Sequence, residues 1–260
     1  MLPFAQALRE LGEESGIPIK LRACDTLGLG VSYPGVALPR SVPGIAYGLW
    51  HHAQIPSSNL EWHGHNDFHR AVVNTGTAWL CGISAANCTL LGIGERTGNT
   101  PLEAMVFEYA ALRGTMDGMN PEVVTEIADY YRTELDYDIP PMMPLVGEDF
   151  NTTRAGIHAD GLLKDKEIYT LFDTEKLLNQ PIKVLINKNS GAAGLLHWIE
   201  AHFGLAPGEL GKRDPRLATI LDWIQGEYEN GRVTAFADEE LEKAIERLQP
   251  DLYAILTRTG

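Results

Sequence analysis

Apolar runs and helical patterns alternate along the first 115 residues. Phe4, Leu8 and Leu11 have the spacing of one helix face, and Gly16 is placed to end that helix. The strand-like runs are residues 17–24, 59–63 and 80–86, and the other helical patterns are residues 41–53 and 67–76. This alternation is typical of βα units on a parallel sheet, so we expect an α/β fold with three parallel strands.

The next helix has a well-marked start. Thr100, Pro101 and Glu103 supply a capping hydroxyl, a proline in the first turn and a capping-box carboxylate. A further helix is expected over residues 120–133, and the three prolines of residues 139–144 indicate a linker. We therefore divide the chain into a βα region (1–115), a helical linker (116–145) and a mainly helical region (146–260).

Composition narrows the range of partners. The chain has 35 Asp and Glu residues against 21 Lys and Arg residues, and its net charge of −14 disfavours nucleic acid and anionic lipid as partners. No apolar run approaches the ~18–20 residues of a membrane span, and the amino terminus lacks the layout of a secretory signal. We therefore expect no nucleic-acid or membrane partner and a cytoplasmic location. The three cysteines lack CxxC spacing, so neither a disulfide framework nor a thiolate zinc site is expected.

The strongest chemical feature is the run EWHGHND at residues 61–67. Side chains alternate faces along a strand, so Glu61, His63 and His65 point the same way and the two imidazoles can converge on one cation. Two imidazoles with oxygen ligands suit Mn²⁺, Mg²⁺ or Zn²⁺, which would act as a Lewis acid. The alternative is a pair of surface histidines, because His-x-His motifs also occur by chance. The position at the carboxyl end of a strand favours the metal site.

A glycine-rich run, NCTLLGIGERTGN, follows the third predicted strand. Its three glycines allow close backbone approach, while Glu95, Arg96 and Asn99 add charge and hydrogen-bonding groups near a helix start. The spacing matches neither the dinucleotide fingerprint nor the P-loop. The alternative is a structural turn in which Arg96 forms an ion pair.

Two weaker features carry the remaining candidates. Arg22 and Thr26, in the run RACDT, place a cation and a hydroxyl at the end of the first strand, where they could hold a carboxylate. His158 lies in the polar run FNTTRAGIHADG, and a lone loop histidine is more often a solvated surface group than a catalyst. Tyr169 has the same ambiguity.

Taken in order, RACDTLG, EWHGHND, NCTLLGIGERTGN, RAGIHADGLLK and NKNSGAAG resemble the motifs of the metal-dependent acyl-CoA-condensing barrel enzymes. This family contains 2-isopropylmalate, homocitrate, citramalate and Re-face citrate synthases. The resemblance covers nearly the whole chain, and FNTTRAGIHADGLLK followed by IYTLFDTEKLL is most similar to the Re-citrate synthase branch. It implies the carboxyl-terminal portion of a (β/α)8 TIM barrel, with its last three βα units, followed by a mainly helical lid.

The resemblance also implies roles for individual residues. His63 and His65 match the ligands of the catalytic divalent cation, and Glu61 matches a carboxylate of the catalytic machinery. Thr26 matches a threonine that binds the substrate's carboxylate. His158 matches a lid histidine that reaches into the barrel of a partner subunit.

The other site residues are matched less directly. Tyr169 is a candidate for a catalytic tyrosine that follows the lid histidine. Arg22, Glu95, Arg96 and Asn99 are predicted to bind substrate, although Ile93 replaces an Asn of several relatives in the same loop and puts contact at that position in doubt.

The implied reaction condenses acetyl-CoA with a 2-oxo acid, with oxaloacetate giving citrate as the favoured case. In the family, the cation chelates the oxo acid through its carboxylate and keto oxygens, and a base removes a proton from the acetyl methyl. The enolate attacks the polarised carbonyl, and water then hydrolyses the thioester. Homocitrate, 2-isopropylmalate and citramalate synthesis are the alternatives.

The predicted βα units are too few for a complete barrel. A (β/α)8 barrel takes about 250 residues, and these units occupy about 115. The resemblance makes them the last three, so five strands and a third metal ligand are expected on another chain, in a homo- or hetero-oligomer. We therefore expect the carboxyl-terminal half of a condensing enzyme, either a split subunit or a truncated product. The alternatives are a non-catalytic partner of a full-length homologue and an unrelated small metal-binding α/β protein.

Overall fold

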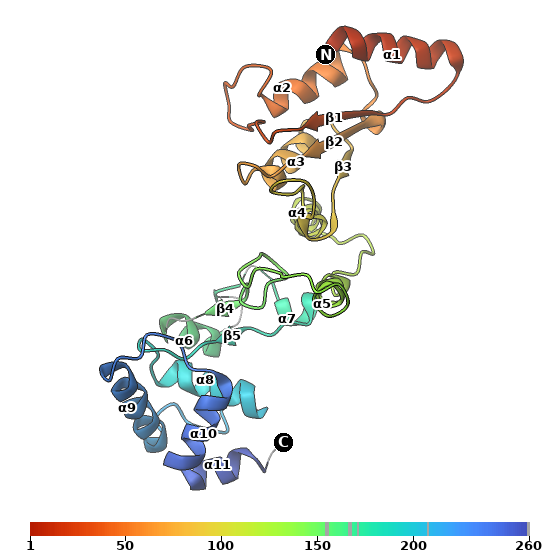
Figure 1. Cartoon of the computed structure of the whole chain (residues 1–260). Helices are drawn as coiled ribbons and strands as arrows, with labels where there is room; N and C mark the ends of the chain where they lie inside the picture. Colours follow the sequence, from red (N-terminus) through yellow and green to blue (C-terminus); the bar gives the residue numbers. More distant parts are fainter. Residues whose placement is uncertain (154–155, 166–167, 171, 207, 259–260) are drawn as a thin grey trace. The chain divides into compact units, whose positions relative to one another are not determined.

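A computed structural model describes residues 1–153, 156–165, 168–170, 172–206 and 208–258 of the chain (Figure 1). It divides into two compact units, Met1–Val124 and Thr125–Gly260. The boundary between the units falls within the segment 116–145 that the sequence indicates as a linker. None of the helices in the described part of the chain is both long and apolar enough to cross a membrane.

The first unit alternates helices and strands, as the sequence predicts. The order is α1 (Leu2–Ser15), β1 (Leu21–Asp25), α2 (Val42–Tyr47), the π-helical turn η1 (Gly48–His52), the 3-10 turn η2 (Ser57–Asn59), β2 (Leu60–Gly64), α3 (Ala71–Leu80), β3 (Ala85–Asn87), the 3-10 turn η3 (Leu90–Gly92) and α4 (Leu102–Arg113). The three strands form one parallel sheet in the order β1-β2-β3. The expected α/β class with parallel strands is therefore confirmed.

One face of this sheet is covered by helices. Leu60 and Trp62 of β2 are fully buried and pack in one core with α1, α2 and α3. Because side chains alternate along a strand, Glu61 and His63 point to the opposite face. The central strand thus has an apolar face that holds the helices and a polar face that carries the candidate chemistry.

Two strands differ in extent from their predictions. The first strand begins at Leu21, where its pairing with Leu60 of β2 begins, and not at Ile17. The third strand is only Ala85–Asn87, because Leu80 is the last residue of α3. The apolar run from Leu80 therefore spans a helix end and a connecting loop, which periodicity alone does not separate from a buried strand.

The predicted capping box of α4 is wrong. The helix begins at Leu102, and its N-cap residue is Pro101, without a side-chain cap. The Thr100 hydroxyl instead bonds the Thr75 hydroxyl at 2.9 Å, and a Glu103 oxygen accepts from the backbone N–H of Leu91 at 3.1 Å. Both groups are used in tertiary contacts, which outweigh the local capping preference.

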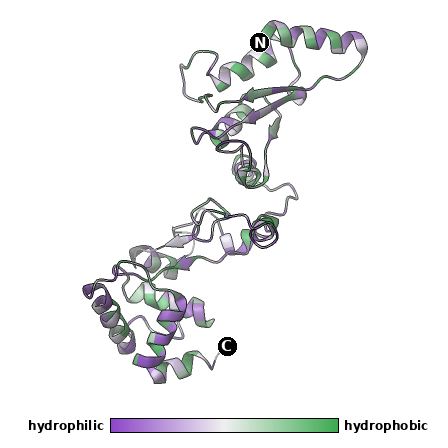
Figure 2. Ribbon diagram, viewed as in Figure 1, coloured by the Kyte–Doolittle hydropathy of each residue, from purple (hydrophilic) through white to green (hydrophobic). Residues whose placement is uncertain are grey.

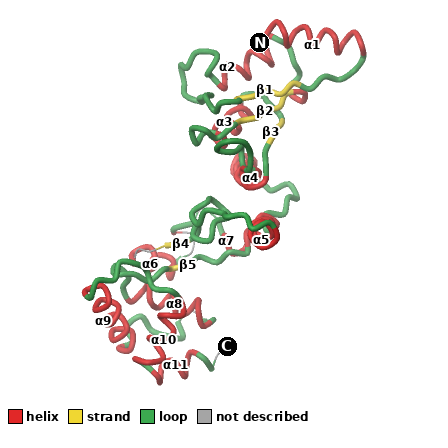
Figure 3. The backbone as a smooth tube through the Cα atoms, in the orientation of Figure 1, coloured by secondary structure: helices red, strands yellow, loops and turns green. Residues whose placement is uncertain are grey.

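The second unit is mainly helices and loops (Figure 3). It contains α5 (Val123–Glu134), whose first two residues precede the unit boundary, β4 (Thr152–Thr153), α6 (Gly156–Lys164), α7 (Thr174–Leu178), β5 (Lys183–Val184), α8 (Ala192–Phe203), α9 (Pro215–Glu229), α10 (Asp238–Leu248) and α11 (Pro250–Leu256). Strands β4 and β5 are parallel to each other. Its core is built from α8 to α11 around Ile199, Ile220 and Ile245. Hydrophobic and hydrophilic residues alternate along these helices (Figure 2), as expected where each helix buries one face.

Candidate metal centre

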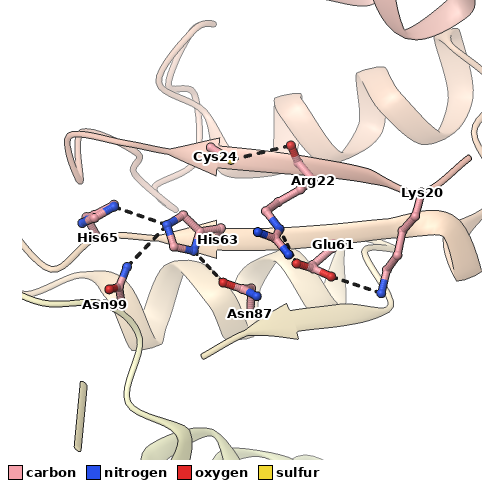
Figure 4. A network of polar contacts seen from close by, with 8 residues as sticks. All are labelled: Lys20, Arg22, Cys24, Glu61, His63, His65, Asn87 and Asn99. Carbon is pink, nitrogen blue, oxygen red and sulfur yellow. Dashed lines mark hydrogen bonds and ion pairs between the residues drawn. The ribbon is translucent and has the colours of Figure 1, made fainter. Parts of the chain in front are cut away.

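The two histidines of the EWHGHND run lie at the carboxyl end of β2 (Figure 4). His63 is in the strand, and His65 follows it and is buried. Their Nε2 atoms are 3.3 Å apart, and the rings meet edge to face at an interplanar angle of 85°. The pair therefore converges as the strand periodicity predicts.

The spacing of this pair fits one shared cation. Two nitrogens 3.3 Å apart, each about 2.1 Å from an ion, would subtend an angle of about 104° at it. That angle lies between the values for neighbouring ligands in octahedral and tetrahedral coordination. Among the residues that the structure describes, however, no group of three or more His, Cys, Asp and Glu side chains could hold a metal ion. By themselves the two imidazoles could supply only part of a coordination sphere.

Asn87 fixes the orientation of the first imidazole. It lies on β3 directly beside His63 in the strand register, and its Oδ1 is 2.7 Å from His63 Nδ1. An amide oxygen only accepts, so Nδ1–H is the donor and the lone pair of the neutral ring is on Nε2. A partner on the far nitrogen that fixes the tautomer is the usual arrangement behind a metal-binding histidine.

The glycine-rich loop places a side-chain amide at the same point. Asn99 Nδ2 is 3.4 Å from His63 Nε2, and rotation of the amide would turn its oxygen there instead. Gly94 allows this position, because a Cβ there would overlap the Asn99 amide. Gly98, at φ +88°, lies so close to the Gly92 carbonyl that a side chain would overlap it. Gly94 is therefore explained by the placement of Asn99, and Gly98 by the close approach of the Gly92 carbonyl.

Glu61 lies on the same strand face but has different partners. Its carboxylate accepts from Nε of Arg22, across the strand register, and lies 3.1 Å from Nζ of Lys20. Burial by itself would raise the pKa of Glu61, but the hydrogen bonds and charges of Lys20 and Arg22 outweigh it and lower the pKa. The group is therefore an ionised carboxylate held between two cations.

Arg96 forms the ion pair that the sequence left open as an alternative. Its Nε and Nη2 bond the Asp67 carboxylate at 2.8 and 3.2 Å, and Nη2 also donates to the Thr26 carbonyl at 2.5 Å. The hydrogen bond from Arg96 lowers the pKa of Asp67. The guanidinium thus ties together the loops that follow β1, β2 and β3. Thr26 and Glu95 are both exposed.

In the second unit, two other candidates lie together. His158, on α6, stacks on Tyr169 with ring centroids 3.9 Å apart and an interplanar angle of 20°. Tyr169 is 53% exposed. Arg154 and Ala155 of the same motif lie outside the described residues. The stacking joins two residues that the sequence proposes separately.

The chain is similar to known proteins over the segment that carries these residues. Residues 18–130, which contain the histidine pair and the glycine-rich loop, match the family model described as HMGL-like. We refer to residues 18–130 as the HMGL-like segment, after this match. The HMGL-like segment runs from just before β1 into α5.

Curated relatives extend the similarity beyond the HMGL-like segment. Over 97% of its length the chain is 51% identical to a citrate (Re)-synthase of Syntrophus aciditrophicus and 48% identical to one of Clostridium kluyveri. It is 38% identical over 88% of its length to a 2-phosphinomethylmalate synthase of Streptomyces hygroscopicus. The resemblance to Re-citrate synthases expected from the motifs is confirmed. The chain spans 40%, 56% and 51% of the lengths of these three relatives.

Three residues of the HMGL-like segment were not assigned a role from the sequence, although Asn87 and Asp67 lie within the quoted motifs. Asn87, Lys20 and Asp67 each bind a predicted site residue. Asn87 could have been found from the rule that carboxyl ends of parallel strands meet at one edge, because it ends the strand next to His63. Lys20 contacts Glu61, and Asp67 contacts Arg96. Both partners are distant in the sequence, so residue spacing does not predict these contacts.

Proposed function

We propose that this chain forms part of the active site of an acyltransferase that condenses acetyl-CoA with a 2-oxo acid, with oxaloacetate giving citrate. The observation that carries the proposal is the convergence of His63 and His65 at the carboxyl end of a parallel strand. It occurs in a chain that is about half identical to two citrate (Re)-synthases. Ligands of open α/β sheets bind at this end of the strands.

His63 and His65 would hold a divalent cation, and Asn99 would add its amide oxygen. Mn²⁺, Mg²⁺ and Zn²⁺ all accept this mixture of nitrogen and oxygen donors. The bound ion supplies Lewis acidity toward the carboxylate and keto oxygens of a 2-oxo acid. Asn87 supports the site by keeping the His63 lone pair on Nε2.

The remaining candidates are assigned by chemistry. Thr26 and Glu95 lie in the loops that Arg96 joins, on the same sheet edge as the histidine pair, where they would contact substrate. Arg96 would shape this rim through Asp67 as well as contact the substrate. His158 and Tyr169, whose rings are stacked, would transfer a proton to or from the acetyl methyl or the product alkoxide, since imidazole and phenol groups both serve as general acids and bases.

The three-stranded sheet supports a partial (β/α)8 barrel. Within the described residues β1 and β3 are the two edges of the sheet, and each edge carries backbone groups that a further strand would satisfy. The longer relatives contain additional sequence that could supply such strands. A complementary chain or segment would close the barrel, give the third metal ligand and form a homo- or hetero-oligomer, with the second unit as the lid.

Release of free thiol from acetyl-CoA tests the proposed activity. The full chain is assayed with Mn²⁺ and with oxaloacetate, 2-oxoglutarate, 2-oxoisovalerate or pyruvate. The assay is run alone and after adding the part of the Clostridium kluyveri relative that this chain does not match. We expect thiol release with oxaloacetate in the mixture and its loss in His63→Ala. Silence in both conditions with all four oxo acids would contradict the proposal.

A further inference from the structure

Two cations lie on the polar face of the sheet before the histidine pair, with Arg22 nearer to the pair and Lys20 beyond Glu61 (Figure 4). Arg22 faces Glu61 in the register of β1 and β2, just as Cys24 faces His63. Lys20 precedes Arg22 by two residues and reaches the same carboxylate. Along the direction of the strands, the ion pairs of Glu61 therefore come first, and the histidine pair begins one strand repeat later.

The Lys20–Glu61–Arg22 cluster has an excess positive charge. One buried carboxylate, with an 11% exposed side chain, faces two cations whose side chains are 55% and 52% exposed. A single cation would neutralise Glu61, and a second one adds repulsion between like charges. A buried carboxylate needs an opposite charge, but one cation already supplies it, so burial of Glu61 does not require the second cation. The cluster of charge +1 is suited to an anion.

The anion would bind through Arg22. Its bond to Glu61 uses Nε, which leaves the terminal NH₂ groups of the fork for another acceptor. Glu61 precedes His63 by two residues, about 6.6 Å along a strand. Arg22, opposite Glu61, is therefore about that far from the histidine pair. If a four-carbon dicarboxylate were held at the pair by its oxo-acid end, its second carboxylate would lie within hydrogen-bond reach of Arg22.

We propose that Arg22, held in position by Glu61, recognises the second carboxylate of a dicarboxylic 2-oxo acid. This inference rests on the proposed function and names the substrate class of that site. Glu61 is then a positioning residue that orients the Arg22 fork, because its carboxylate is occupied by two cations. Arg22 decides between dicarboxylic and monocarboxylic oxo acids.

Direct binding tests this without turnover. Freshly dissolved oxaloacetate and pyruvate, which differ by the second carboxylate, are titrated calorimetrically into the chain with Mg²⁺. The complementary segment is present wherever the thiol assay requires it. Hydrogen bonds to a charged partner contribute about 1.5–3 kcal/mol, so we expect Arg22→Gln to weaken oxaloacetate binding about 10- to 100-fold and leave pyruvate binding unchanged. The matched control is Arg9→Gln, which removes an ion pair between Arg9 and Glu13 on α1.

Two further variants separate recognition from folding. Arg22→Lys keeps the charge but loses the fork, and it should retain part of the preference for oxaloacetate. Glu61→Gln should weaken oxaloacetate binding more than pyruvate binding, whereas a purely structural Glu61 would weaken both equally. Thermal unfolding of each variant confirms the folded state.

The outcomes distinguish this inference from the proposed function. Equal binding of both oxo acids by the unmodified chain, or a preference that survives in Arg22→Gln, would overturn the role of Arg22 and leave the condensation proposal standing. Binding of neither oxo acid would overturn both. Loss of the preference in Arg22→Gln, with Arg9→Gln binding as the unmodified chain does, supports the inference.

Discussion

His63 and Asn87 are joined across two neighbouring strands, with Nδ1 of the ring 2.7 Å from Oδ1 of the amide. This contact sets which ring nitrogen carries the proton. It therefore controls whether Nε2 can face a cation together with His65.

Removing this contact should weaken metal binding without removing a ligand. In Asn87→Leu the imidazole can rotate or carry its proton on Nε2, so we expect about 10- to 100-fold weaker binding of Mn²⁺. The affinity is measured by titration followed by electron paramagnetic resonance of free Mn²⁺. Asn59→Leu, outside the histidine site, is the control and should bind normally. An unchanged affinity in Asn87→Leu would show that the contact has no role in binding.

A side chain at Gly94 should displace Asn99. The Cβ of Gly94→Ala would overlap the Asn99 amide, which moves away from His63 Nε2. We expect at least about 10-fold weaker Mn²⁺ binding, because the Asn99 amide oxygen would no longer reach the ion and even the loss of an outer contact to a ligand costs that much. In Gly211→Ala the new Cβ has nothing within 4 Å, so this control should behave as the unmodified chain. Equal affinity in the two variants would remove Asn99 from the proposed coordination sphere.

Glu103 should contribute more to the stability of the folded chain in acid than at neutral pH. Burial raises the pKa of Glu103, against the lowering effect of backbone hydrogen bonds that include the Leu91 N–H. The folded state therefore favours the protonated acid, and this stabilising contribution is present below the unfolded pKa of about 4.3 and is lost as pH rises through the folded value.

The variant Glu103→Gln isolates this contribution. It keeps an acceptor for Leu91 and removes the buried charge, so we expect a higher Tm than the unmodified chain at about pH 7 and a difference that shrinks toward about pH 4. Thermal unfolding at a series of pH values measures it. Glu108→Gln, on the same helix, is the control. A difference that grows as pH falls would contradict the assigned direction.

The three cysteines should differ in reactivity. Burial and the nearby Glu103 and Glu61 carboxylates raise the pKa of Cys88 to about 11, and burial also raises the pKa of Cys81. Cys24 is exposed on β1. At about pH 8 only about one Cys88 in a thousand is a thiolate, so iodoacetamide should alkylate Cys24 at least about 10-fold faster.

Peptide mass spectrometry of the native chain measures these rates. Cys24→Ser should remove the fast phase, and unfolding in denaturant should make the remaining thiols react at similar rates. Fast labelling of Cys88 in the native chain would show that its surroundings are open to solvent.

Much of the first unit follows from local sequence because its elements are separated by unambiguous signals. Gly16 ends α1 in the left-handed conformation at φ 70°, as its position predicts, and the βα alternation gives three parallel strands. The convergence of His63 and His65 follows from the strand repeat alone. These features depend on neighbours a few residues away.

The parts that sequence reasoning did not find depend on contacts between distant residues. The Thr100 hydroxyl bonds the Thr75 hydroxyl instead of capping α4. The Glu103 carboxylate accepts from the Leu91 N–H instead of completing a capping box. The partners of Glu61 became visible only with the register that sets Arg22 opposite it. A strand register depends on the tertiary structure. A sequence motif therefore identifies the side chains of a site but not the neighbouring residues that set their charge.

The Lys20–Glu61–Arg22 cluster also has a kinetic consequence. A dianion approaching this chain meets a net charge of −14 at long range and the excess positive charge of the cluster only at short range. Added salt screens the long-range repulsion first, because the Debye length is about 10 Å at 0.1 M ionic strength. Capture of a dianion should therefore become faster as moderate salt is added, the reverse of ordinary electrostatic steering.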